Sequence, residues 1–358
     1  MFYQLDFSAE VIAWYRENKR NLPWRNTKIP YFIWISEIIL QQTRVEQGLA
    51  YYERFVERFP TIENLAAANE DEVLKLWQGL GYYSRARNLH FTAKTICKNL
   101  NGKFPNNYAE IRKLKGIGDY TAAAIASFCF NQPHPVVDGN VYRVLSRVFG
   151  ITTPIDTAKG KKEFYALAHE LLDSQKPAWH NQAMMEFGAI HCTPKNPACA
   201  SCIFKSKCIA FNKKIVKKLP VKAGKTKQRN RYFDYLIIKQ NGNIFIKKRT
   251  EKDIWKNLYE FPLIENKKQM SENNLIKSKK WNELLGKSRY HIVKKSSIYK
   301  HVLSHQKLFT RFWEIEVSKP HKKLPDSFIP IREQALGKYP VSQLIANYLE
   351  KNLCKQNI

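Results

Sequence analysis

A marked hydrophobic pattern is the apolar run from Tyr31 to Leu40, broken only by Ser36 and Glu37. The run is apolar on every side of a helix, which predicts a buried helix rather than one with a single core-facing stripe. Because burial disfavours the charged form of a carboxyl group, Glu37 is expected to be protonated near neutral pH. A neutral carboxylic acid suits general acid catalysis, although a glutamate reaching water from a helix edge fits the same local sequence.

A second buried helix is predicted by the small and apolar residues from Thr121 to Phe130, which follow a turn at Gly116 and Gly118. Glycine admits backbone conformations that are closed to other residues and lets a partner approach closely. The free N–H groups at the start of this helix would suit an anion such as a DNA phosphate. Asp138 then precedes apolar residues at helical spacing: Val141, Val144, Leu145, Val148 and Phe149. Asp138 fits a helix N-cap, a residue facing a cleft, or both.

After residue 231 the pattern changes from helical spacing to strands. Residues 232–239 and 244–249 are strand-like and flank Asn241-Gly242, a strong hairpin signal. A further strand is expected over 308–317 and an amphipathic helix over 341–349. The sequence therefore predicts an all-α domain over 1–212, whose first helix runs from Ser8 to Arg16, and an α+β domain over 232–358. Residues 213–231 hold nine basic residues and no acidic ones, which predicts an extended linker along DNA.

Composition narrows the class of partner. The 358 residues include 60 Lys and Arg against 31 Asp and Glu, a net charge of +29 that favours a polyanion or a membrane surface. Interleaved aromatic residues favour nucleic acid, because aromatic rings can stack on bases or wedge between them. The N-terminus has no apolar core of signal-peptide type, and no apolar run approaches the length of a membrane span. We therefore expect a soluble intracellular protein that does not bind membranes.

Four of the seven cysteines are bunched within a short segment: Cys192, Cys199, Cys202 and Cys208. Disulfides are disfavoured in a reducing compartment, so a metal site is the better interpretation. Four thiolates suit zinc by ligand type. Zinc sites usually pair their cysteines in two close knuckles, however, and only one close pair exists here, so both zinc and an iron–sulfur cluster stay open on ligand type and spacing alone.

Several motifs, in order along the chain, resemble those of a known enzyme family. Two of them resemble the endonuclease III superfamily of DNA glycosylases: Leu114-x-Gly116-x-Gly118-x-x-Thr121-Ala122 and Val137-Asp138-Gly139-Asn140-Val141. Three more look like the MutY-type adenine DNA glycosylases: Pro23-Trp24-Arg25, Trp34-x-Ser36-Glu37-x-x-Leu40-Gln41-Gln42-Thr43 and Gly79-Leu80-Gly81-Tyr82-Tyr83. In the C-terminal part, Trp255-x-x-Leu258-Tyr259-Glu260-Phe261-Pro262 is similar to the marker of the Nudix-type domain that this family carries.

The resemblance implies a fold and a cofactor. It implies a helix-hairpin-helix glycosylase domain with its hairpin at about 114–121, followed by a Nudix-like lesion-recognition domain. That second domain carries no Glu-rich Nudix catalytic box, so it should bind and not hydrolyse. The cysteine spacing matches the 4Fe–4S loop of the superfamily residue for residue, which makes a 4Fe–4S cluster over 192–208 the expected cofactor.

The resemblance also implies an activity, the removal of adenine mispaired with 8-oxoguanine or guanine in double-stranded DNA. Glu37 would protonate the base and Asp138 would stay ionised beside the sugar, with Tyr120 and Asn140 orienting them. Glycosylases that also cut the backbone carry Lys where Tyr120 stands, so a monofunctional enzyme is expected. The implied DNA contacts are Arg25, Gln42, Thr43, Tyr82, Gly116, Gly118, Ser304 and His305. Leu303 stands where the family more often has Phe, which leaves the packing of the loop at Ser304 and His305 open.

Two alternatives stay open from the sequence. A thymine-mismatch glycosylase of the same fold would suit Tyr120 and Asp138, although Glu37 and the full second domain favour adenine. A non-catalytic iron–sulfur protein that only binds lesions would show affinity for mismatches without base release. A strand-cutting lyase is disfavoured by Tyr120, because a phenol cannot form a Schiff base. In each case we expect a monomer that binds duplex DNA.

Overall fold

The computed structural model describes residues 2–224, 228–320 and 324–352 and contains two compact units. The first unit comprises Met1–Ala67 and Asn88–Gly224, and the second comprises Ala68–Arg87 and Lys225–Ile358. This division differs from the expected boundaries in two places. Residues 213–224 belong to the helical unit and not to a free linker, and residues 68–87 belong with the C-terminal sheet.

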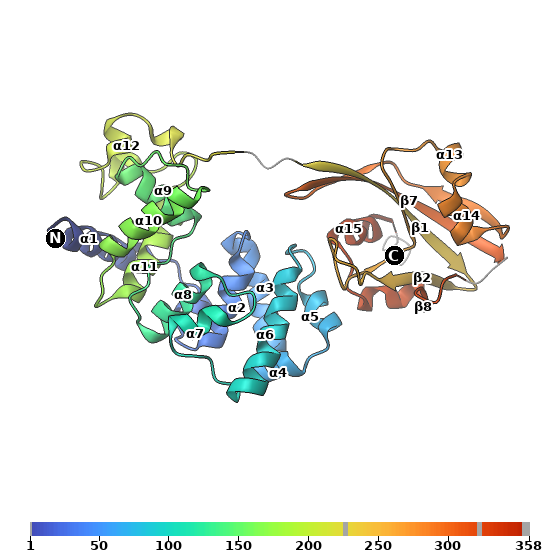
Figure 1. The fold of residues 1–358 in the computed structure, drawn as a ribbon, viewed down its shortest axis with the longest axis horizontal. Coiled ribbons are helices and arrows are strands. Elements are labelled where there is room, and N and C mark those ends of the chain that lie inside the picture. The colour runs from blue at the N-terminus through green and yellow to red at the C-terminus, as the bar shows by residue number, and fades with distance from the viewer. Residues whose placement is uncertain (1, 225–227, 321–323, 353–358) are drawn as a thin grey trace. The chain divides into compact units, whose positions relative to one another are not determined.

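The first unit is helical (Figure 1). In chain order its elements are α1 (Phe2–Asn18), the short η1 (Pro23–Arg25), α2 (Pro30–Leu40), α3 (Val45–Arg58), α4 (Ile62–Ala67), α6 (Ser84–Leu100, which begins in the second unit), α7 (Tyr108–Lys113), α8 (Asp119–Phe130), α9 (Gly139–Val148), α10 (Ala158–Leu171), α11 (Pro177–Glu186), η2 (Phe187–His191), η3 (Cys199–Ser201), α12 (Ile209–Asn212) and η4 (Val216–Lys218). Among the described residues of both units, none of the helices is both long and apolar enough to cross a membrane.

Helix α2 is the buried helix that the apolar run predicts. Every residue from Ile33 to Ile39 is buried, and Ile35 and Ile39 have no exposed surface. Burying one such side chain stabilises the fold by roughly 1.5–3 kcal/mol. That stabilisation offsets the cost of keeping Glu37 in the same helix, where only 5% of its surface is exposed.

The predicted hairpin forms between α7 and α8. Gly116 has a φ of 81°, and a Cβ atom there would lie 2.6 Å from the Cβ of Asn88 on α6, so the turn requires glycine. Gly118 has an ordinary φ of −90° and is the N-cap of α8, and a Cβ atom would meet nothing within 4 Å. The residues from Thr121 to Phe128 are buried, as their small and apolar character predicts.

The basic segment after the cysteines is partly packed. Leu219 is buried in a small cluster with Cys208 and Ala210, and Ile155 donates a backbone hydrogen bond to Val221. Apolar residues at 215, 216, 219 and 221 hold this segment on the helical unit. The expected extended linker is therefore shorter than 213–231, and its residues 225–227 lie outside the described part of the chain.

The second unit is built on a mixed sheet. Its elements are α5 (Glu70–Leu76), β1 (Arg229–Gln240), β2 (Asn243–Lys248), β3 (Tyr259–Glu260), β4 (Leu263–Asn266), α13 (Glu272–Ile276), α14 (Lys279–Leu285), β5 (Arg289–Lys295), β6 (Tyr299–Val302), β7 (Gln306–Lys319), β8 (Ile329–Arg332), η5 (Glu333–Lys338) and α15 (Gln343–Asn352). The strand order is β3-β2-β1-β7-β5, with β4 beside β1, β6 beside β7 and β8 beside β2.

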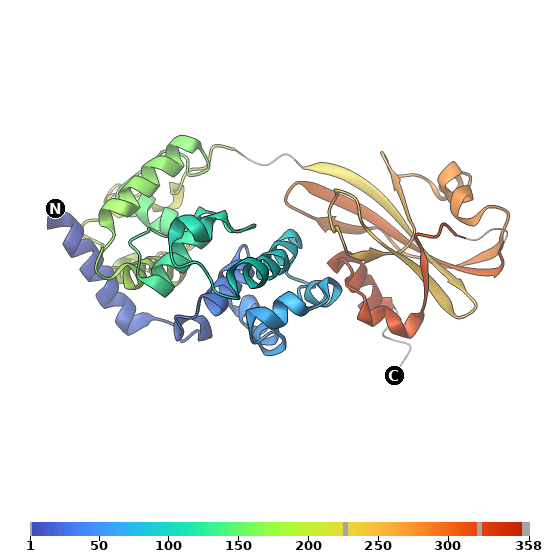
Figure 2. The same cartoon turned by 60° about the horizontal axis from the view of Figure 1, so that its bottom comes forward.

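Two cores cover the two faces of this sheet (Figure 2). Helix α15 packs on one face through Leu344, Ile345 and Tyr348, and α13 and α14 pack on the other through Leu275 and Trp281. The long strands β1 and β7 are parallel neighbours at the centre, whereas β1 and β2 form the antiparallel hairpin predicted at Asn241-Gly242. The predicted α+β domain is confirmed.

Candidate active site

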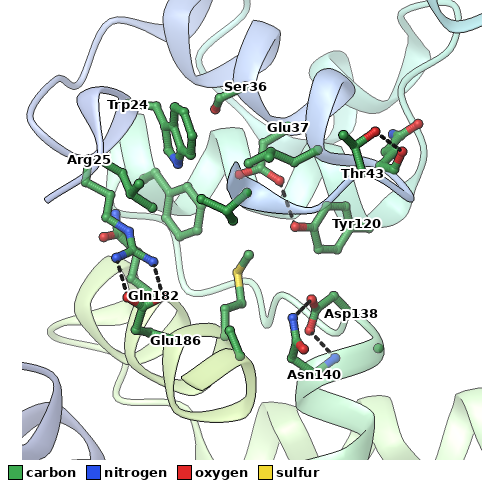
Figure 3. A pocket seen from close by; sticks show the side chains of 18 of the residues that line it. Trp24, Arg25, Ser36, Glu37, Thr43, Tyr120, Asp138, Asn140, Gln182 and Glu186 are labelled. Carbon is green, nitrogen blue, oxygen red and sulfur yellow. Dashed lines mark hydrogen bonds and ion pairs between the residues drawn. The ribbon is translucent and has the colours of Figure 1, made fainter. Parts of the chain in front are cut away.

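One cavity in the helical unit, of about 500 Å³, gathers residues that are far apart in the sequence (Figure 3). Its wall is formed by η1, α2, α8, the start of α9, and α11. The volume lies within the ~300–1,000 Å³ of typical ligand pockets. The sequence-predicted residues that line it are Arg25, Glu37, Gln42, Thr43, Tyr120, Asp138 and Asn140.

Glu37, which is buried, and Tyr120, which is half-buried, form a hydrogen-bonded pair in this cavity. The Tyr120 hydroxyl donates to Glu37 Oε2 at 2.7 Å. Burial raises the pKa of Glu37 to about 7, against the opposing effect of the Tyr120 hydrogen bond, and the charge of Asp138 raises it further. Burial also holds the pKa of Tyr120 well above its ordinary value, so this side chain stays a hydrogen-bond donor. The expected protonated state of Glu37 near neutral pH agrees with this environment.

Asp138 is both an N-cap and a cavity residue, so its two sequence interpretations hold together. Its Oδ1 accepts from the backbone N–H groups of Asn140 and Val141 at 2.9 and 2.8 Å, and its Oδ2 accepts from Asn140 Nδ2 at 2.7 Å. Burial is the largest effect and raises the pKa of Asp138 above its ordinary value, and these hydrogen bonds and the charge of Arg143 oppose it only in part. The carboxylate is thus fixed in orientation by the start of α9.

A chain of hydrogen bonds runs from Asp138 to the first cysteine of the predicted cluster. Asn140 Oδ1 accepts from Arg143 Nη2 at 2.9 Å, and Arg143 Nε donates to the carbonyl of Cys192 at 2.8 Å. Gly188 permits this approach, because a Cβ atom there would lie 2.7 Å from the Cβ of Asn140. Arg143 was not predicted, because no local pattern indicates that this cation on α9 is buried and meets Asn140 and Cys192.

The end of the cavity beside η1 holds an ion-pair cluster around Glu186. This carboxylate accepts from Arg20 Nη2 and from Arg25 Nη2, each at 2.6 Å (Figure 3 labels Arg25 and Glu186). Burial alone would raise the pKa of Glu186, but the hydrogen bonds from both arginines outweigh it and lower the pKa to about 2. Glu186, Arg20 and the adjacent Gln182 were not predicted, because no local pattern ties them to Arg25.

The remaining predicted DNA contacts are not among the residues that line this cavity. Gly116 and Gly118 form the hairpin turn of the helical unit. Tyr82 and Ser304 are brought together in the second unit, where the Tyr82 hydroxyl contacts Ser304 Oγ. Tyr82 is 46% exposed and has a left-handed backbone, with a φ of 46°. His305 is exposed in the same loop as Ser304.

The four predicted metal ligands line one small cavity between α9, η2 and the loop after it: Cys192, Cys199, Cys202 and Cys208. Arg147 donates to the sulfur of Cys192 at 3.4 Å and to the carbonyl of Thr193 at 2.7 Å. Among the described residues, however, no three Cys, His, Asp or Glu side chains are close enough together to form a ready metal site. The four cysteines thus share one cavity without forming a closed ligand set.

Comparison with known proteins identifies both units. Residues 35–172 match the HhH-GPD superfamily of base excision DNA repair proteins, and residues 235–351 match the NUDIX domain. An adenine DNA glycosylase of Buchnera aphidicola from Schizaphis graminum is 38% identical over 307 residues, which cover 86% of this chain and 84% of that protein. The human adenine DNA glycosylase is 41% identical over 213 residues, or 57% of this chain and 39% of that protein.

Solved structures agree with this assignment for the fold. A thermostable thymine-DNA glycosylase matches with a TM-score of 0.54 and 29% identity, over 59% of this chain and 97% of that one. Endonuclease III in a non-covalent DNA complex matches with a TM-score of 0.52 and 22% identity, over 60% of this chain and 98% of that one. Together with the carboxyl groups, arginines and phenol in one cavity, these likenesses show that the chain belongs to the adenine DNA glycosylase family of base excision repair enzymes.

Proposed function

We propose that this adenine DNA glycosylase acts on adenine mispaired with 8-oxoguanine, and with guanine, and that it releases the base without cutting the backbone. The observation that carries the proposal is the pair of carboxyl groups, Glu37 and Asp138, in one cavity but in different surroundings. Glu37 has a pKa of about 7, and Asp138 accepts hydrogen bonds from the backbone N–H groups at the start of α9. Glycosidic cleavage needs such a division between an acid and a cation stabiliser.

Glu37 is the proposed acid. Adenine inside a duplex must first be flipped out of the stack before it can enter the cavity. The Glu37 carboxyl then gives its proton to N7 of the base, and the C1′–N9 bond breaks with its electron pair leaving on adenine. The resulting Glu37 carboxylate takes a proton from the water that attacks C1′, which restores the carboxyl group and completes hydrolysis. Tyr120 holds Glu37 in place through the 2.7 Å hydrogen bond.

Asp138 is the proposed partner for the oxocarbenium-like sugar. Its two hydrogen bonds from the start of α9 and one from Asn140 Nδ2 fix the carboxylate and favour its charged form as positive charge develops. Tyr120 supports the absence of strand cutting, since a phenol cannot form the imine through which lyases act. We assign Asn140 as the residue that orients Asp138.

The DNA contacts are proposed from their places in the fold. Arg25, held by Glu186 in the cavity, would face the edge of the flipped base. Gln42 and Thr43 line the same cavity, and Gln42 and the exposed Tyr82 would fill the gap in the duplex. The turn at Gly116 and Gly118 would bind a backbone phosphate. Ser304 and His305 would read the base opposite adenine. We expect the active form to be a monomer.

A 4Fe–4S cluster is the proposed cofactor, held by the thiolates of Cys192, Cys199, Cys202 and Cys208. Its role would be structural, fixing the loop that carries Lys195, Lys205 and Lys207 toward phosphates. Replacing Cys202 by Ala should remove iron and inorganic sulfide from the purified protein, both of which can be measured by colorimetric assay. Zinc without sulfide in the wild-type protein would refute the cluster.

The function is tested by single-turnover release of adenine from a duplex with one 8-oxoguanine·adenine pair. Wild type and Glu37→Gln are compared with enzyme in excess, and abasic products are revealed by hot alkali. We expect release by wild type only, with equal DNA binding by both. Strand breaks without alkali would refute the monofunctional reaction. A guanine·thymine duplex tests thymine release, which the likeness to a thymine-DNA glycosylase makes the second candidate.

A further inference from the structure

The first turn of α5 is acidic in a strongly basic chain, and the sheet of the second unit binds it. Asp71 Oδ1 pairs with Lys248 Nζ at 2.5 Å, and Asp71 Oδ2 accepts from the Tyr259 hydroxyl at 2.9 Å. Lys248 on β2 and Tyr259 on β3 are direct cross-strand partners, so one carboxylate holds both strands at this edge. Side-chain exposures of 29% for Asp71 and 33% for Lys248 place the pair partly out of water, where it is screened less than a surface pair.

Glu70, the neighbouring residue, holds the loop that follows β2. Its Oε1 accepts from Asn257 Nδ2 at 2.5 Å. Asn257 and Trp255 both have left-handed backbones, with φ values of 67° and 61°. Such conformations persist in residues other than glycine only where several contacts enforce them. Arg249 makes two of the contacts that hold this loop. Its Nε donates to the carbonyl of Ile254, and its backbone carbonyl accepts from the N–H of Asn257.

The same loop supports the hairpin that carries the proposed lesion-reading residues. The Trp255 ring lies 6.0 Å from the ring of His301, the residue where this hairpin, 301–305, begins. Leu303 donates its backbone N–H to Gln306 at 2.8 Å, which closes the hairpin tip. Contacts therefore lead from Glu70 through Asn257 and Trp255 to the residues before Ser304.

The C-terminal end of the segment 68–87 also contacts the rest of the second unit. Tyr83 is buried and its hydroxyl donates to the carbonyl of Val341 at 3.3 Å, while Gln78 Oε1 accepts from the N–H of Val341. Tyr82, the proposed wedge, is the residue before Tyr83 and contacts Ser304. The wedge and the hairpin are thus held side by side within the second unit.

We infer that Glu70 and Asp71 are positioning residues for lesion recognition, which hold Tyr82 and the hairpin 301–305 together before DNA binds. This inference rests on the proposed function. Prearranging the two parts removes the cost of ordering them on binding, so more of the contact energy can distinguish 8-oxoguanine from guanine. Neither residue touches DNA in this role, and neither belongs to the cavity that cleaves adenine.

The test is a charge reversal with rescue: Asp71→Lys, Lys248→Asp and the double variant. The readout is the ratio of single-turnover adenine release from 8-oxoguanine·adenine over guanine·adenine duplexes at enzyme excess. We expect each single variant to lower this ratio about tenfold, within the ~5–150-fold range of couplings between sites. The double variant should restore it to within about twofold, because the ion pair is rebuilt in reverse. Glu163→Lys, an exposed acid on α10 with the same charge change, is the matched control.

Each outcome decides between the two proposals. An unchanged ratio in Asp71→Lys, or a lowered ratio that the double variant fails to restore, would overturn the positioning role. If Asp71→Lys does not fold, Asp71→Asn and Glu70→Gln take its place, with a smaller expected loss of about threefold each. Failure of the wild-type protein to release adenine from either duplex would refute the proposed function itself. Preference for 8-oxoguanine in wild type with no effect of the variants would refute the positioning role alone.

Discussion

The hydrogen bond from Tyr120 to Glu37 should set the pH at which the enzyme loses its acid. Because the phenol donates to Glu37 Oε2, it stabilises the ionised carboxylate and lowers the pKa of Glu37, against the larger effect of burial. Replacing Tyr120 by Phe removes this donor and keeps the ring. The pKa of Glu37 should therefore rise above its value of about 7.

The size of the shift follows from the worth of one hydrogen bond to a charged group. Such bonds contribute about 1.5–3 kcal/mol, and one pKa unit corresponds to ~1.4 kcal/mol. The rate of adenine release should fall at alkaline pH as Glu37 loses its proton. The midpoint of this alkaline limb of the pH–rate profile should move from about 7 in wild type to roughly 8–9 in Tyr120→Phe. At pH 8.5 the protonated fraction would be only ~3% in wild type but about half in the variant.

The assay is single-turnover adenine release from pH 5.5 to 9.5, with enzyme in excess so that DNA affinity does not limit the rate. Each profile is normalised to its own acidic plateau, since the loss of the hydroxyl also loosens Glu37 and lowers the plateau. Tyr108→Phe is the control, because the Tyr108 hydroxyl contacts Asp119 outside the cavity at 3.4 Å. Its limb should coincide with that of wild type.

The reasoning fails if the limb of Tyr120→Phe stays in place or moves to lower pH. Either result would mean that the hydrogen bond does not act on the acid of the reaction. If the rate of wild type also shows no decline at alkaline pH, Glu37 is not the acid of the reaction. A limb that shifts equally in Tyr108→Phe would point to a general effect of phenol removal.

Three further predictions concern stability and geometry. The unfolded chain loses the Glu37 proton near its ordinary pKa of 4.5, but the folded protein keeps it until about 7, so stability falls as pH rises between these values. Glu37→Gln should thus be more stable than wild type by ~3 kcal/mol at pH 8 and not at pH 4.5, as measured by urea denaturation. Burial lowers the pKa of His180, which is hydrogen-bonded to Ser8, to about 4, so the unfolded chain binds a proton first as pH falls below 6.5. Between pH 7.5 and pH 5 wild type should therefore lose ~2 kcal/mol of stability relative to His180→Gln, in which the other groups titrate alike; an equal pH dependence of the two proteins would contradict this. In Arg143→Lys a single ammonium group replaces the guanidinium that donates to both Asn140 and Cys192. Adenine release should therefore slow about tenfold to a hundredfold, with DNA binding retained. Adenine release at the wild-type rate in Arg143→Lys would show that Arg143 does not support the reaction.

Local patterns in the sequence predicted those parts of the site that depend on a single segment. The all-round apolar character of α2 predicted a buried helix but left open whether Glu37 reaches water at its edge, and the residues after Asp138 predicted a helix start there. The cluster at Glu186 was missed, because Arg20 and Arg25 lie 166 and 161 positions away from it in the sequence. Nothing in the local pattern of an arginine indicates which distant carboxylate it meets.

Local patterns also failed to predict how the strands of the sheet pair. Strands β1 and β7 were both predicted, since their alternation is local, but their parallel pairing was not. The place of residues 68–87 was also missed, because their sequence is that of a helix and turn and their partners are more than 160 positions later. Long-range pairing depends on which surfaces fit, and this information is distributed over both segments.

The pairing of β1 with β7 also determines the order in which the chain can fold on the ribosome. Each pair joins residues 77 positions apart, as between Arg229 and Gln306, so the central strands cannot meet until β7 has been synthesised. At ~5–20 residues per second, on the order of 5–20 s separate the emergence of residue 224 from that of residue 319. During that interval the nascent chain holds every residue of the cavity, whereas β1 can pair with β2 and β4 but not yet with β7. The hairpin 301–305 is also made late, so all the residues that line the cavity exist before the loop that contacts Tyr82 has formed.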